Sequence, residues 1–250
     1  MRTANTVVVH SKPKLKDPIL LEGLPGIGNV GKTVADHLAE VFGAKLFVTV
    51  YSKHFPPQAT LDGECVASLA SNELWYAKDV GGHDLVFLLG DCQGLTPDGQ
   101  YEVCKEMMED VFLKIGVSRI YTLGGYGTGL ISECPRVLGA VSDAGMKPEL
   151  EEAGVVFSMG EPGAGIVGAS GLFLGFGKIA GIPSACLMGE TSGHFVDHKS
   201  ALAVVEVLEK LIGFEIDKTM FEEMARHIDE LAAHIAENEK TDSGDLGYIG

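Results

Sequence analysis

Short runs of β-forming residues alternate with helical segments along most of the chain, and brief glycine-rich turns separate them. Residues 84–89 form an almost continuous apolar run, which is typical of a strand buried on both faces of a sheet. Residues 28–42 instead repeat valine and leucine at helical spacing. This alternation predicts an α/β domain in which helices cover both faces of a largely parallel sheet.

The individual elements follow from the same two periodicities. The predicted strands are 7–9, 19–21, 45–51, 60–71, 74–77, 84–89, 119–123, 137–141 and 184–188. The predicted helices are 28–42, 99–115, 147–153, 163–180 and 199–212. We expect an antiparallel excursion around Asn72 and Glu73, and no domain boundary within residues 1–214.

The character of the sequence changes after residue 214. Apolar residues recur there at spacings of three and four, which predicts an amphipathic helix over 215–238. They are Phe221, Met224, Ile228, Leu231 and Ile235. This helix is expected to pack either on its own domain or against another subunit, so the five residues are candidate oligomer contacts. Residues 239–250 are polar and glycine-rich until Leu246, and we expect them to form a flexible acidic tail.

Charge excludes several classes of partner. The chain has 19 Lys and Arg against 35 Asp and Glu, a formal net charge of −16. Such a balance argues against binding nucleic acid and against docking on anionic membranes. Residues 215–250 hold ten acidic and three basic residues, so nearly half of the excess charge lies at this end.

Cysteine usage indicates the compartment. The five cysteines are an odd number without a C-x-x-C pair, which is typical of reduced thiols in the cytoplasm rather than of disulfides or a zinc site.

His194 and His198 are four residues apart but lack an evident third ligand, so no metal is expected. Residues 163–189 carry a single charge, Lys178, yet their glycines favour a buried helix, a turn and a strand over a membrane span.

The most conspicuous motif is GIGNVGKT at residues 26–33, which matches the phosphate-binding pattern G-x-x-x-x-G-K-[ST]. In that interpretation, amides from Gly26 to Gly31 cradle phosphates, Lys32 reaches the terminal phosphates and Thr33 binds magnesium. Asp91 would then position the metal, although it follows the strand one residue late. The alternative is a strand-to-helix turn that uses glycine for close packing.

A weaker pattern surrounds Ser170. The sequence GASGL at 168–172 approaches the nucleophile pattern G-x-S-x-G, but leucine replaces the last glycine and no base is evident. Tyr126 follows a predicted strand end, where α/β folds place ligand sites. A hydrolase with a small-molecule site near Tyr126 and Ser170 is a third possibility.

The turn LPGIGNVG at 24–31 resembles the signature turn of a known family, the proteasome assembly chaperone family of the second type. The motif residues are Pro25, Gly26, Gly28, Asn29 and Gly31, and in this family Lys32 is incidental. Segments 85–93, 122–129, 163–172 and 188–193 resemble the family as well, so the resemblance covers about residues 17–212.

This resemblance implies a three-layer α/β/α sandwich, similar to nucleoside phosphorylases and related hydrolases, without established catalytic activity or cofactor. It also implies an archaeal-type, cytoplasmic homo-oligomer that binds the α subunits of the proteasome core particle through its C-terminal tail. Leu246, Tyr248, Ile249 and Gly250 are then the partner-binding residues. Tyr248 is third from the end, whereas the family's tyrosine is penultimate. Nucleotide binding through Gly26, Gly31, Lys32, Thr33 and Asp91 is the alternative function.

Overall fold

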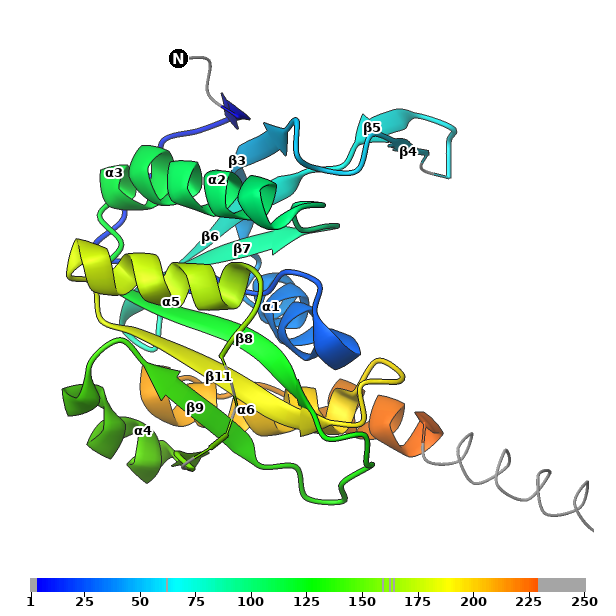
Figure 1. Cartoon of the computed structure of the whole chain (residues 1–250), viewed down its shortest axis with the longest axis vertical. Coiled ribbons are helices and arrows are strands. Elements are labelled where there is room, and N and C mark those ends of the chain that lie inside the picture. The colour runs from blue at the N-terminus through cyan, green and yellow to red at the C-terminus, as the bar shows by residue number, and fades with distance from the viewer. Residues whose placement is uncertain (1–3, 62, 159, 162, 164, 229–250) are drawn as a thin grey trace, which may run out of the picture.

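A mixed β-sheet forms the centre of the protein (Figure 1). The computed structural model describes residues 4–61, 63–158, 160, 161, 163 and 165–228. The strands are β1 Asn5–Val9, β2 Ile19–Glu22, β3 Lys45–Ser52, β4 Ala59–Leu61, β5 Ala67–Leu69, β6 Asn72–Val80, β7 His83–Gly90, β8 Arg119–Gly127, β9 Val137–Val141, β10 Val155–Val156 and β11 Ser184–Thr191. Within the described residues the sheet has nine strands in the order β1-β3-β6-β7-β2-β8-β11-β9-β10, and β4 pairs only with β5.

Strand direction differs between the centre and the flanks of this sheet. Strands β7, β2, β8 and β11 are parallel neighbours, whereas β1–β3, β3–β6, β6–β7 and β11–β9 pair antiparallel. The prediction of a largely parallel sheet is therefore confirmed for the four central strands and for the pair β9–β10, and it is wrong for the other four pairs. One cause is the turn at Gly81 and Gly82, where two positive φ angles join β6 to β7 as a hairpin.

Helices lie on both faces of the sheet, with α2 and α5 in front of it and α1 and α6 behind it in Figure 1. The helices are η1 Ile27–Asn29, α1 Val30–Val41, α2 Pro97–Met107, η2 Met108–Phe112, α3 Leu113–Ile115, η3 Ala144–Met146, α4 Lys147–Ala153, α5 Ala169–Ala180 and α6 His198–Ile212. Alternate residues of each central strand face opposite layers: Leu21 packs with α1, α4 and α6, and Leu20 packs with α2 and α5.

The structure corrects the bounds of two predicted elements. Helix α5 starts at Ala169 rather than at residue 163, because Gly163, Gly165 and Gly168 have positive φ angles that interrupt a helix. The antiparallel excursion lies at β4 and β5, and β6 runs without interruption from Asn72.

The described part of the C-terminal segment packs on the domain. Residues 219–228 are helical, Phe221 is fully buried, and its ring meets that of His37 edge-on at 4.7 Å. This favours packing within the chain for Phe221, whereas Met224 is 45% exposed. The other predicted contact residues of this segment lie outside the described residues: Leu231, Ile235, Leu246, Tyr248, Ile249 and Gly250. In the described part of the chain no helix is long and apolar enough to cross a membrane.

Candidate functional site

A cavity of about 940 Å³ opens at the carboxyl ends of the central strands, on the face that α2 and α5 cover. The chain leaving β2 passes to α1 on one face, and the chain leaving the adjacent parallel strand β7 passes to α2 on the other. Ligand sites of open α/β sheets lie at such reversals of connection. The loops after both strands line this cavity, together with Gly124–Gly127 and the start of α5.

The lining is apolar with a few neutral polar groups. Aliphatic side chains and the rings of Tyr101 and Tyr126 form most of the wall. Ser170, Gln93 and Gln100 supply polar side chains, and no charged side chain lines the cavity among the described residues. Apolar walls with a small number of placed polar groups are typical of small-molecule sites.

A buried carboxyl group lies behind the cavity wall. Glu22 ends β2 with no exposed surface; its Oε2 accepts a hydrogen bond from Ser170 Oγ at 2.8 Å, and its Oε1 accepts one from the Leu24 amide at 3.2 Å. Desolvation raises the pKa of Glu22 from 4.5 to about 7, against the lowering effect of these two hydrogen bonds. Ser170 thus links an ionisable group at the sheet centre to the cavity.

Gln93 fixes the two loops that flank this link. Its Nε2 donates to the Pro25 carbonyl at 2.8 Å, and its Oε1 accepts from the Ala169 amide at 2.9 Å. The glutamine therefore ties the turn after β2 to the first residue of α5. Both polar ends of the side chain are used in holding the cavity wall.

The glycine turn between β2 and α1 lets the chain pack closely against neighbouring segments. Gly28 and Asn29 both adopt left-handed conformations, with φ angles of 61° and 48°. A Cβ atom on Gly31 would overlap the Leu123 carbonyl oxygen, so only glycine lets α1 approach β8 this closely. The turn is also bonded to the rest of the chain, because the Gly28 carbonyl accepts from the Asp197 amide at 3.0 Å.

The residues of the phosphate-binding interpretation are divided between two places. Gly26 lines the large cavity, whereas Lys32 and Asp91 line a separate hollow of about 200 Å³ beside β6 and β7. Lys32 Nζ donates to the Gly90 carbonyl at 3.2 Å and pairs with Asp36 at 2.9 Å. In this geometry Lys32 does not reach over the glycine amides, so the arrangement lends the nucleotide alternative no support.

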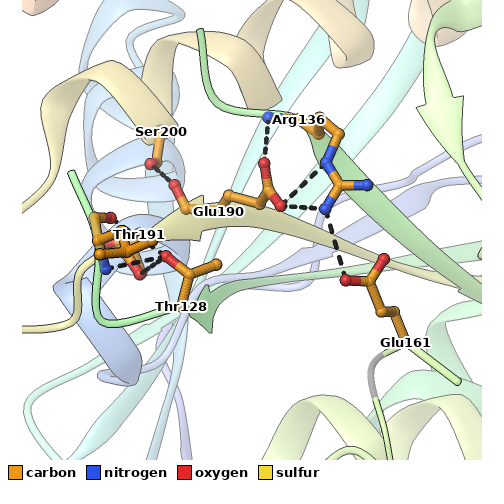
Figure 2. A network of polar contacts seen from close by, with 7 residues as sticks. Thr128, Arg136, Glu161, Glu190, Thr191 and Ser200 are labelled. Carbon is orange, nitrogen blue, oxygen red and sulfur yellow. Dashed lines mark hydrogen bonds and ion pairs between the residues drawn. The ribbon is translucent and has the colours of Figure 1, made fainter. Parts of the chain in front are cut away.

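A second polar cluster lies at the ends of β8 and β11 (Figure 2). The Glu190 carboxylate accepts from Arg136 Nε at 2.9 Å and from the Arg136 amide at 3.0 Å, and these contacts hold its pKa below the usual range. Arg136 also reaches Glu161 at 3.5 Å. The Thr128 amide donates to the Thr191 carbonyl at 2.8 Å, so the cluster ties the loop before β9 to β11. This cluster is already internally paired.

Sequence reasoning missed the partner of Ser170. Glu22 directly follows the apolar residues 19–21, and an acidic residue there does not fit the apolar pattern of a buried strand. The available signal was its position at the end of a central strand, because a glutamate is almost never fully buried unless it has a partner. Among the described residues no three His, Cys, Asp or Glu side chains gather as a metal site.

The fold and the site define a class of α/β protein in which a packed glycine turn and an uncharged cavity lie at the carboxyl ends of a parallel core. The PAC2 family model matches residues 20–236. The chain therefore belongs to the PAC2 family, and the resemblance carried by its glycine turn is confirmed.

Individual relatives extend over almost the whole chain. PbaB of Pyrococcus furiosus, described as an archaeal proteasome activator, has 38% sequence identity and a TM-score of 0.87, covering 94% of this chain and 100% of that one. PbaA of the same organism, an archaeal homologue of proteasome-assembly chaperone, has 26% identity and a TM-score of 0.77, covering 98% and 96%. The uncharacterized protein MJ1210 of Methanocaldococcus jannaschii is 34% identical over 246 residues, covering 94% of this chain and 93% of that one.

Proposed function

We propose that this protein is a chaperone-like factor of the cytoplasm that binds the α subunits of the proteasome core particle. The observation that carries the proposal is the likeness to PbaB and PbaA over at least 94% of the chain. Both of those proteins are described by their relation to the proteasome. The family match over residues 20–236 supports a common role.

The contact with the α ring is made by the C-terminal residues Leu246, Tyr248, Ile249 and Gly250. An aromatic ring between aliphatic residues, close to the terminal carboxylate, suits an apolar pocket with a basic group at its mouth. A homo-oligomer would present several such ends at once, and the high effective concentration would strengthen a weak single contact.

Activation of the assembled particle is a second candidate. It is favoured by one observation, the 38% identity and TM-score of 0.87 to a protein described as an activator. The two roles differ in the species bound: an assembly chaperone acts on free α subunits or α rings, whereas an activator acts on the finished particle.

The experiment compares the full chain with a variant lacking residues 246–250. Both are added to purified archaeal α subunits and to assembled core particle, and binding is measured by co-sedimentation. We expect the deletion to reduce α-ring binding at least tenfold, a loss of about 1.4 kcal/mol. Tyr248→Ala should reproduce most of this loss, and Thr241→Ala is the matched control in the same segment.

The same samples separate the two roles. Faster assembly from free subunits supports the chaperone, and faster peptide hydrolysis by finished particles supports the activator. Unchanged binding after the deletion would refute docking through the tail. If the full chain binds neither species, the proteasome proposal itself is wrong.

A further inference from the structure

The cavity at the carboxyl ends of β2, β8 and β11 is lined by residues of a defined chemical kind. Its volume of about 940 Å³ is within the usual range for small-molecule sites. Among the described residues the lining is uncharged, whereas residues 215–250 hold ten acidic and three basic residues. The lining therefore suits an uncharged occupant better than this acidic segment.

The hydrogen bond between Ser170 and Glu22 sets the polarity of the cavity wall. An ionised carboxylate can only accept hydrogen bonds. Glu22 Oε1 accepts from the Leu24 amide, so the Ser170 hydroxyl proton is directed to Oε2 at 2.8 Å. Ser170 Oγ then presents lone pairs, and no proton, to the cavity.

The surroundings of Glu22 exclude a charged ligand. The carboxylate lies against the first turn of α5, whose positive end is thereby neutralised. The thiols of Cys104 and Cys186 are near enough to feel the charge of Glu22, and burial raises the pKa of both, so they add no charge. An anion would find no positively charged side chain in the described lining, and a cation would be separated from the Glu22 carboxylate by Ser170.

We propose that this cavity binds a small, uncharged aromatic molecule that donates an N–H or O–H hydrogen bond to Ser170 Oγ. The rings of Tyr101 and Tyr126 and the side chains of Leu24, Leu172 and Met188 form the apolar walls around it. Gln93 holds the site open by joining the turn at Pro25 to the start of α5.

Three probes of nearly the same size test the preference at pH 8.5, where Glu22 is ionised. Indole carries a donor, benzoxazole carries only acceptors, and indene carries neither. Dissociation constants for the full chain are measured by ligand-observed NMR. We expect indole to bind about three- to tenfold more tightly than indene, the value of one ordinary hydrogen bond, and benzoxazole to gain nothing.

Two substitutions make the assignment specific. In Glu22→Gln the side-chain amide donates to Ser170 Oγ, so the serine proton turns to the cavity and benzoxazole should now bind more tightly than indole. Gly124→Val fills the cavity, because a Cβ there meets only Met188 Cγ at 3.9 Å. It should weaken all three probes at least tenfold. Gly175→Val, on the exposed side of α5 with open space around it, is the matched control.

Equal affinities for the three probes, or an unchanged order in Glu22→Gln, would overturn the proposal. Binding that survives Gly124→Val would place the probes elsewhere and overturn it too. Binding that appears only after residues 239–250 are removed would assign the cavity to the chain's own end. None of these outcomes depends on contact with the proteasome.

Discussion

A single carboxyl group, Glu22, sets the chemistry of the sheet centre. It is fully buried, and the groups that face it are the Ser170 hydroxyl, the Leu24 amide and the thiols of Cys104 and Cys186. None of these is a cation, so the two hydrogen bonds to Glu22 compensate only part of the desolvation cost of its ionisation. That cost explains why the pKa of Glu22 is raised to about 7.

The raised pKa makes stability depend on pH in a defined direction. Between pH 4.5 and about 7 the folded state binds more protons than the unfolded state, so the stabilisation from neutral Glu22 is lost as pH rises. Glu22→Gln should therefore be about 3 kcal/mol more stable than the native chain at pH 8, with little difference at pH 4. Urea unfolding of both proteins at the two pH values measures this. A constant difference across pH would contradict the raised pKa.

Helix α1 packs its apolar face on the sheet, and two glycines set its closest approach to the strands. Gly31 lies against the Leu123 carbonyl of β8, and Gly23 at the end of β2 lies against Ala35 of the same helix. Close packing of this kind fixes the height of α1 above the sheet. It also positions the preceding turn, which forms one wall of the cavity.

The packing of α1 predicts opposite effects for one substitution in two helices. Gly31→Ala should destabilise the fold by about 1–3 kcal/mol, since overlap with the β8 backbone outweighs the helix propensity gained. Gly175→Ala in α5 has open space and should stabilise the fold by about 0.5–1 kcal/mol. Thermal unfolding of both variants decides the signs. A Gly31→Ala variant at least as stable as the native chain would contradict the close packing of α1 on β8.

The sequence predicted where most strands and helices lie, but it predicted less well whether neighbouring strands are parallel or antiparallel. Apolar runs located the central strands, and helical spacing located α1 and α6 to within two residues. Parallel and antiparallel neighbours bury the same residue types, so the hairpin between β6 and β7 could not be distinguished from a crossover by its strands alone. Ser170 and Tyr126 were recognised near one site, but Glu22 is 148 positions from Ser170 and only the fold brings them together.

On the scale of the whole molecule, an uncharged cavity in the central body contrasts with an acidic C-terminal segment. The central body holds an uncharged cavity at the carboxyl ends of its parallel strands. The segment from residue 215 holds ten acidic and three basic residues, and its first helical turns lie on the body through Phe221. We therefore expect substitutions in the cavity and substitutions after residue 214 to affect the two proposed kinds of binding separately.

Phe221 and Met224 divide these roles within one helical turn. Phe221 is fully buried beside His37, so Phe221→Ala should lower the free energy of unfolding by about 3–5 kcal/mol. Met224 is 45% exposed, so Met224→Asp should leave the fold intact while reducing the mass of the proposed homo-oligomer, as measured by light scattering. Met224→Leu is the matched control and should keep the native mass, because it preserves the apolar surface. If Met224→Asp also keeps that mass, the subunits associate through another face, and residues 219–228 serve only to cover the core beside α1.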